Sequence, residues 1–266
     1  MKVNILEQIL GSEWSIIPAG GSTGDAFLAE SDGQKLFLKR NSSPFLAVLS
    51  AEGIVPKLVW TKRVENGDVF SAQHWKTGRH LSPNEMQEAR VARMLKKIHN
   101  SKELLQMLKR MRVEPLLPFE IHTTLIKNLD KSLLNDEIIQ KAFAYLQDAL
   151  ELVQPETLMV CHSDVNHNNW LLSSEGDLYL IDWDEAVIAD PAIDLGIILY
   201  CYIPKDDWGK WLANYGVPLT YSLETRVKWY TIVQSLLSIQ YYGEKLLEKQ
   251  VAYWREILEM CLEGKD

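Results

Sequence analysis

A polar run between short apolar segments is the feature that most restricts how this chain folds. Residues 162–169 read His-Ser-Asp-Val-Asn-His-Asn-Asn, and the apolar residues Trp170, Leu171 and Leu172 follow directly. A second apolar run, residues 179–181, ends at Asp182. Short apolar runs bounded by polar and turn residues are typical of strands. A strand between the two polar positions would bring residues 162–169 and Asp182 to one cleft.

These polar residues suit phosphoryl transfer. The carboxylate of Asp164 can accept the proton of an attacking hydroxyl. Asn169 and Asp182 offer the neutral and anionic oxygen ligands that Mg²⁺ prefers. The spacing His-x-Asp-x-x-x-x-Asn, followed by an Asp at a strand end, matches the catalytic loop and metal-binding Asp of kinases. Asp164 or Asn169 alone is most often a turn residue, and their joint spacing with Asp182 favours a site.

The chain resembles the aminoglycoside phosphotransferase and choline kinase family, which has a protein-kinase-like fold. Three ordered motifs carry the resemblance. The His-Gly-Asp-x-His-x-x-Asn loop corresponds to residues 162–169, the Ile-Asp-Trp-Asp motif to residues 181–184, and the Asp-Pro-x-x-Asp-Leu motif to residues 190–195. The resemblance implies a small-molecule kinase that uses ATP and Mg²⁺, with Asp164 as catalytic base and Asn169 and Asp182 on the metal.

The catalytic loop departs from the family pattern at three positions. Ser163 and Asn168 replace glycine, and Asn166 replaces histidine. This variant is most similar to the bacterial CcrZ/YtmP-like group, which is linked to cell-cycle control, so division proteins are implied as partners. That likeness alone makes a ribose-like sugar or nucleoside the first expected acceptor. Choline, an amino alcohol or an aminoglycoside is the alternative.

The resemblance also assigns residues around the nucleotide and the loop. Lys39 would reach the α- and β-phosphates and Glu52 would pair with Lys39. The small residues 20–24 would form the loop over the phosphates, and residues 73–75 would be the adenine hinge. The other nucleotide-binding residues implied are Gly21, Ser22, Thr23, Gly24, Gln73 and Trp75. Supporting residues are His162 and Asp194, and possible substrate contacts are Asn166, His167 and Asp184.

Simpler interpretations remain open for several of these residues. Lys39 alone could be a solvated strand lysine, and residues 20–24 an ordinary hairpin turn. His99 follows two lysines at a helix end, where interaction with the helix dipole would explain it.

The pattern predicts an α+β, bilobal fold. A small β-rich lobe of residues 1–76 would contain strands at 35–39 and 69–75 and a helix at 45–52. A larger helical lobe, residues 77–266, would enclose a β island at 158–183. Its first helix would start at Ser82, where Pro83 and Glu85 complete an N-terminal capping signature.

Composition restricts the class of protein further. Acidic residues outnumber basic ones by 36 to 28, which disfavours nucleic acid and anionic membranes as partners. The three cysteines are far apart and form no Cys-x-x-Cys pair, so we expect reduced thiols in a cytoplasmic protein. We expect neither a signal peptide nor a membrane span.

Two other functions compete with a small-molecule kinase. A nucleotide-binding regulatory or scaffold protein would act through partners, although it would not need Asp164, Asn169 and Asp182 together. A protein kinase is disfavoured because Asp190 and Pro191 follow Asp182 closely, which leaves little platform for a peptide substrate.

Overall fold

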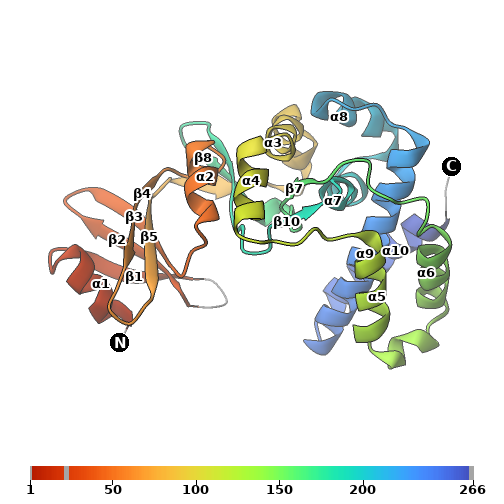
Figure 1. The fold of residues 1–266 in the computed structure, drawn as a ribbon, viewed down its shortest axis with the longest axis horizontal. Coiled ribbons are helices and arrows are strands. Elements are labelled where there is room, and N and C mark those ends of the chain that lie inside the picture. Colours follow the sequence, from red (N-terminus) through yellow and green to blue (C-terminus); the bar gives the residue numbers. More distant parts are fainter. Residues whose placement is uncertain (1, 21–23, 264–266) are drawn as a thin grey trace. The chain divides into compact units, whose positions relative to one another are not determined.

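The computed structural model describes residues 2–20 and 24–263 and shows a mixed α+β fold (Figure 1). Contacts between Cα atoms divide the chain into two compact units. Unit 1 comprises Met1–His80 and Asn168–Asp184, and unit 2 comprises Leu81–His167 and Glu185–Asp266. The first is rich in strands and the second is largely helical. The predicted α+β fold class is therefore confirmed.

Unit 1 is built on a five-stranded antiparallel sheet. In spatial order its strands are β1 (Ser15–Gly20), β2 (Ala26–Ser31), β3 (Gln34–Arg40), β5 (Val69–His74) and β4 (Leu58–Arg63). The predicted strands at 35–39 and 69–75 are β3 and β5. Alternation along β3 buries Leu36 and Leu38 against Phe27, Phe70 and helix α1 (Lys2–Leu10), which directs Lys39 to the opposite face.

A second, three-stranded sheet of unit 1 carries the hairpin that Asn169 and Asp182, the predicted metal ligands, flank. Its strands are β6 (Gly78–His80), β8 (Trp170–Ser173) and β9 (Leu178–Leu180), in that order. Gly78 pairs with Ser173, and a Cβ atom there would lie 2.3 Å from the carbonyl oxygen of Leu172. The glycine therefore permits this close approach. The predicted lobes were residues 1–76 and 77–266. The two units differ from them because residues 168–184, whose strand β8 pairs with β6, belong to unit 1.

Unit 2 is assembled around helix α9 (Tyr221–Glu244). Helices α5 (Pro118–Asn128), α6 (Glu137–Asp148), α7 (Ala192–Tyr202) and α10 (Glu248–Glu263) contact it. Trp229 of α9 is fully buried and its indole N–H donates to the carbonyl oxygen of Leu146 at 3.0 Å. The other helices of the unit are α3 (Ala89–His99), α4 (Lys102–Arg110) and α8 (Trp208–Tyr215). Strands β7 (Met159–Cys161) and β10 (Val187–Ala189) form an antiparallel pair.

The helix predicted from Ser82 is interrupted. The capping signature is present, since the Glu85 carboxylate accepts the N–H of Ser82 at 2.9 Å. The segment that follows is a 3₁₀ turn, η1 (Pro83–Gln87), and Glu88 has an extended backbone before α3 begins. Helix α3 buries Val91, Leu95 and Ile98, which share one face at helical spacing. The capping signature at Ser82 is therefore confirmed, and the prediction of one continuous helix is wrong at Glu88.

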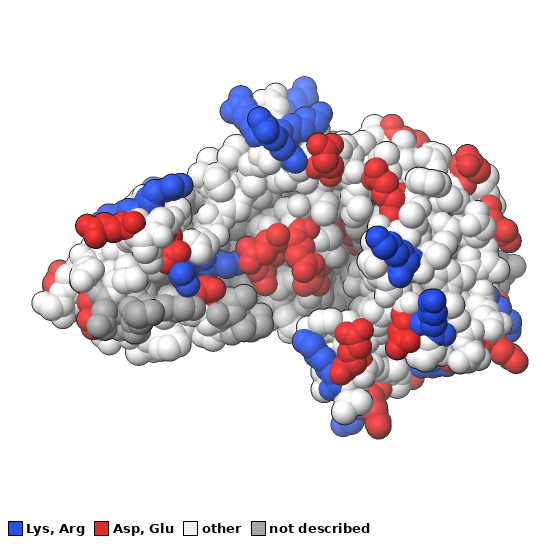
Figure 2. Space-filling view, turned by 60° about the horizontal axis from the view of Figure 1, so that its bottom comes forward, with Lys and Arg blue, Asp and Glu red and all other residues white. Residues whose placement is uncertain are grey.

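Figure 2 shows a group of basic side chains at its upper edge and acidic side chains gathered near its centre, with both signs mixed over the rest of this face. The excess of acidic over basic residues, 36 against 28, does not make this face uniformly negative. Among the described helices, none combines the length and the apolar character that crossing a bilayer requires.

The contact between α7 and α9 depends on Gly196. A Cβ atom there would lie 2.6 Å from the Thr231 hydroxyl oxygen and 2.7 Å from the Val227 carbonyl oxygen. We expect Gly196→Ala to lower the free energy of unfolding by about 1–3 kcal/mol, because the two helices must separate. Urea unfolding measures this. Gly209→Ala is the control: the position is exposed in α8 with nothing within 4 Å, so stability should stay or rise. Equal stability of both variants would contradict the packing argument.

Candidate active site

The residues predicted for catalysis fall into two sets, one in each unit. Lys39, Asn169, Asp182 and Asp184 belong to unit 1. The loop containing Asp164 belongs to unit 2, together with Asp194. Each set is described below by its own contacts.

In unit 1, the β8–β9 hairpin brings Asn169 and Asp182 together. Trp170, the first residue of β8, pairs with Leu180, the last residue of β9. One residue outward, the N–H of Ile181 donates to the carbonyl oxygen of Asn169 at 2.8 Å. Asn169 and Asp182 therefore lie at the same end of the hairpin. An amide and a carboxylate at one strand end are a partial ligand set for Mg²⁺.

Trp183 fixes the segment that follows β9. Its indole N–H donates to the carbonyl oxygen of Leu180 at 2.7 Å, and its ring meets Phe45 of α2 (Phe45–Ala51) edge to face at 5.7 Å. The side chains on either side of it, Asp182 and Asp184, are 60% and 62% exposed. One buried anchor thus leaves both neighbouring carboxylates at the surface of the unit.

The backbone of Asp182 adopts a left-handed conformation, with φ of 65°. For a residue other than glycine this conformation costs about 1–3 kcal/mol and persists only where the surroundings impose it. The anchored Trp183 is such a surrounding contact. Backbone strain of this kind clusters at functional sites.

Lys39 lies beside both carboxylates. Its Nζ is 2.7 Å from Oδ2 of Asp184 and 3.5 Å from Oδ1 of Asp182. Strand β3 positions the lysine, whose side chain is about one quarter exposed. A lysine next to two carboxylates fits a nucleotide whose phosphates bind both a lysine and a divalent cation. The side chains present therefore suit Mg²⁺ and ATP.

Other predicted nucleotide-binding residues are less well defined. Glu52 follows α2 and is half-buried, and the described partners of Lys39 are Asp182 and Asp184. Pairing of Lys39 with Glu52 stays a prediction. Gly21, Ser22 and Thr23 lie outside the described residues. Gly24 has a φ of 62°, a conformation that glycine adopts easily.

The predicted adenine hinge has its described hydrogen bonds within unit 1. The buried amide of Gln73 donates to the carbonyl oxygen of Pro56 at 2.7 Å. The backbone N–H of His74 donates to Lys57 and that of Trp75 to Lys35. These N–H groups already have acceptors, so the adenine contacts of this segment stay a prediction.

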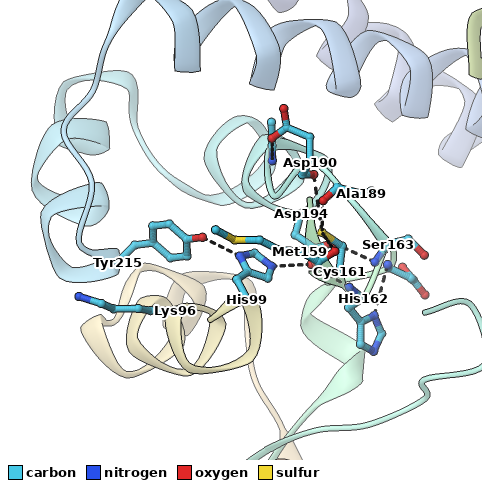
Figure 3. Close-up of polar contacts among 12 residues, drawn as sticks. Lys96, His99, Met159, Cys161, His162, Ser163, Ala189, Asp190, Asp194 and Tyr215 are labelled. Atoms are coloured by element: carbon cyan, nitrogen blue, oxygen red, sulfur yellow. Dashed lines mark hydrogen bonds and ion pairs between the residues drawn. The ribbon is translucent and has the colours of Figure 1, made fainter. Parts of the chain in front are cut away.

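In unit 2, Asp194 holds the start of the catalytic loop (Figure 3). It lies in the first turn of α7 and is fully buried. Its Oδ2 accepts the N–H of His162 and its Oδ1 accepts the N–H of Ser163, both at 2.8 Å. His162 is also fully buried, and its Nδ1 accepts the N–H of Asp164 at 3.3 Å. These contacts are of the kind that a supporting role for His162 and Asp194 requires.

Ser163 explains how the loop accommodates a residue other than glycine. Its φ is 66°, a left-handed conformation in which glycine is favoured. Its hydroxyl donates to the carbonyl oxygen of Glu185 at 2.8 Å, and its N–H is bound by Asp194. The side chain thus contributes a contact that glycine would lack, which offsets part of the strain.

Within the loop, Asn166 contacts the predicted base directly. Its amide donates to Oδ1 of Asp164 at 2.6 Å, and a contact of Asn166 with the substrate stays a prediction. The backbone N–H of His167 donates to the Tyr202 hydroxyl at 3.1 Å, and Nδ1 of the His167 ring lies 3.2 Å from the same hydroxyl oxygen. Burial raises the pKa of Tyr202 to about 12, so this hydroxyl keeps its proton. Tyr202 was missed because it lies 35 residues further along the chain.

The two aspartates of the Asp-Pro-x-x-Asp-Leu motif have different partners. Asp190 is fully buried and binds Arg226 of α9 at 2.7 and 2.8 Å. Burial raises the pKa of Asp190, and the hydrogen bond from Arg226 opposes that shift. Asp194 instead binds His99 at 3.0 Å. The helix-dipole interpretation of His99 missed this contact, because the ring is turned into the interior.

The model of the phosphotransferase enzyme family called APH matches residues 15–230, so the chain belongs to that family. Solved structures show the same fold. The chain is similar to the choline kinase LicA from Streptococcus pneumoniae, with 17% identity, 97% of this chain and 99% of that chain covered, and a TM-score of 0.68.

Two antibiotic-modifying enzymes give similar matches. Spectinomycin phosphotransferase APH(9)-Ia is 17% identical over 93% of this chain and 92% of that one, with a TM-score of 0.68. A kanamycin-bound APH(2")-IIIa structure is 14% identical over 100% and 99% of the chains, with a TM-score of 0.73. At these identities the likeness establishes the shared fold.

The left-handed backbone at Ser163 generates a stability prediction. Ser163→Ala loses the bond to Glu185 and keeps the strain, so we expect a loss of about 1 kcal/mol in the free energy of unfolding. Ser163→Gly loses the same bond and relieves the strain. It should therefore be about 0.5–1 kcal/mol more stable than Ser163→Ala in chemical denaturation. At Ser222, inside helix α9, the order should reverse. An alanine variant of Ser163 as stable as the glycine variant would contradict the strain argument.

Proposed function

We propose that the protein transfers the γ-phosphoryl group of ATP to a hydroxyl of a small molecule. The observation that carries this proposal is the gathering of Lys39, Asp182 and Asp184 beside Asn169 at one end of the β8–β9 hairpin. Phosphoryl transfer consists mostly of positioning and charge stabilisation, and these are the side chains it uses. The family assignment of residues 15–230 supports the same reaction.

Each side chain has a distinct task in this proposal. Lys39 leaves the carboxylates and binds the phosphates of the nucleotide. Asn169 and Asp182 hold Mg²⁺, which when bound neutralises charge on the phosphates. Solved structures of related fold contain ADP with spectinomycin, AMP, or GDP with kanamycin, which supports a purine nucleotide as the phosphoryl donor.

Asp164 is the proposed base. It orients the acceptor hydroxyl and takes its proton as the new P–O bond forms and the bond to the departing diphosphate breaks. The amide of Asn166 holds Oδ1 of Asp164 at 2.6 Å, which fixes the carboxylate. The bonds from Asp194 to the two preceding N–H groups fix the backbone that carries it.

The chemical class of the acceptor is a separate, narrower proposal. A ribose-like sugar or nucleoside rests only on the likeness of the variant loop to the CcrZ/YtmP-like group. The alternative class is choline, an amino alcohol or an aminoglycoside, and the neighbours of related fold include a choline kinase and a kanamycin-bound enzyme. A cytoplasmic location and a role in cell-cycle regulation through division proteins belong to the same narrow proposal.

The first experiment measures ATP consumption by the purified protein with Mg²⁺ and a panel of acceptors. The panel holds sugars, nucleosides, choline-like alcohols and aminoglycosides. We expect Asp164→Asn to lower kcat by about 10²–10⁴-fold with the stimulating acceptor, because proton transfer is lost. Nucleotide affinity should change by no more than about twofold, because the phosphates bind elsewhere.

Asp148→Asn is the matched control, since it makes the same change at an exposed position ending α6. Undiminished turnover of Asp164→Asn would remove the assignment of the base. Nucleotide binding without stimulation by any acceptor would favour a regulatory module. Retention of partners and cell-division phenotype by Asp164→Asn would point to that role too.

The dependence of ATP binding on Mg²⁺ tests the role proposed for Asp182. We expect Asp182→Asn to weaken ATP binding in Mg²⁺ by about tenfold or more, because one charged ligand is lost. Addition of EDTA should then change the affinity of the variant much less than that of the wild type. Titration calorimetry measures both, with Asp177→Asn on the same hairpin as control. A wild-type affinity for ATP that does not change on addition of EDTA would refute metal binding by Asp182.

A further inference from the structure

A chain of buried hydrogen bonds leads from the catalytic loop to a helix that sequence motifs do not mark. Figure 3 shows Tyr215, His99 and Asp194 in line, ending at His162 and Ser163. The Tyr215 hydroxyl is 2.7 Å from Nδ1 of His99, and Nε2 of His99 is 3.0 Å from Oδ2 of Asp194. The side chains of His99 and Asp194 are 0% exposed, and Tyr215 is 4% exposed.

The proton positions in this chain follow from its ends. The Asp194 carboxylate accepts two backbone N–H groups, so it is an acceptor toward His99 as well. His99 must therefore carry its proton on Nε2. Nδ1 of a neutral ring is then an acceptor, and the Tyr215 hydroxyl donates to it. Burial raises the pKa of Tyr215, so the phenol keeps the proton that it donates.

The tautomer of His99 decides whether Asp194 is fully bonded. With the proton on Nδ1 instead, the lone pair of Nε2 would face the carboxylate at 3.0 Å. That contact is repulsive, and the ring or the carboxylate would have to turn. Either movement disturbs the bonds from Asp194 to His162 and Ser163, the residues directly before Asp164. The Asp194 carboxylate, which only accepts, thus selects the tautomer, and the Tyr215 hydroxyl holds the ring by donating to the other nitrogen.

Tyr215 is itself held rigidly. Its ring stacks on Trp211 of the same helix at 6.5 Å, and the Trp211 indole N–H donates to the carbonyl oxygen of Met86 at 3.2 Å. Helix α8 ends directly after it at Gly216, which has a φ of 102°. The Lys96 side chain covers that glycine, since a Cβ there would lie 2.3 Å from Nζ. The hydroxyl is therefore fixed relative to α3, which carries His99.

The cluster around His99 and Asp194 also has the composition of a metal site. Ligand atoms of His99, Cys161 and Asp194 lie within 4.8 Å of one another, as in a metal site. Burial raises the pKa of the Cys161 thiol strongly, which disfavours the thiolate that metals bind. Both ring nitrogens of His99 and both oxygens of Asp194 already have partners. The geometry is that of a hydrogen-bonded network.

We propose that Tyr215 is a positioning residue that acts through His99 and Asp194 to hold the catalytic loop. The effect on turnover rests on the proposed kinase function, whereas the effect on loop order does not. The proposal concerns one hydroxyl, because the ring of Tyr215 packs on Trp211 whether or not the hydroxyl is present.

Tyr215→Phe removes that hydroxyl and keeps the ring. We expect amide hydrogen exchange in a peptide spanning residues 160–166 to become about fivefold faster, as loss of one hydrogen bond implies. We expect kcat to fall by a similar factor, with the dissociation constant for ATP unchanged. The matched control is Tyr230→Phe: Tyr230 is 2% exposed in the same unit, and its hydroxyl has no described hydrogen-bond partner. That variant should match the wild type in both measurements.

A pair of His99 variants gives a second test. Glutamine retains an N–H that can reach Asp194, and leucine of similar size does not, so His99→Gln should protect the 160–166 amides better than His99→Leu. Equal exchange in Tyr215→Phe and Tyr230→Phe would overturn the proposal, as would equal protection in the two His99 variants. Faster exchange in Tyr215→Phe with no turnover by the wild type on any acceptor would support the positioning role and count against the kinase function alone.

Discussion

The hydrogen bonds from two consecutive backbone N–H groups to the Asp194 carboxylate are the interaction on which the predicted catalytic loop depends. A carboxylate buried away from water is costly unless its oxygens are bonded, and here backbone donors supply part of that compensation. The same bonds hold Ser163 in a left-handed conformation that it would otherwise avoid. One buried charge thus stabilises both the helix start that carries it and the loop that it contacts.

The companion aspartate shows why this arrangement is specific. Asp190 is only four residues before Asp194, yet it faces Arg226 and forms a conventional buried ion pair. Its oxygen also accepts the N–H of Ala192 at 2.8 Å, which caps the beginning of α7. Had Asp194 a cationic partner of this kind, fewer of its lone pairs would be left for the loop. The His99 ring fills the remaining position without competing for the backbone contacts.

Local spacing explains how much of this site could be predicted from the sequence. Asn169 and Asp182 flank one short hairpin, so two apolar runs and a turn suffice to place them together. The face of β3 that carries Lys39 follows from alternation in the same way. The ionic partners of Lys39 lie more than 140 residues away, and no local pattern distinguishes Asp184 from Glu52. The contact of His99 with Tyr215, 116 residues apart, is equally invisible to periodicity.

Strain occurs in both residue sets and is compensated differently in each. Ser163 and Asp182 are both non-glycine residues with φ near 65°. At Ser163 the surroundings bind the backbone itself, through Asp194 and the hydroxyl contact to Glu185. At Asp182 they bind the next side chain, Trp183, and leave the carboxylate exposed. The proposed base Asp164, directly after Ser163, must be held in one orientation, whereas the proposed metal ligand Asp182 must stay accessible to its ion. The two forms of support match those two requirements.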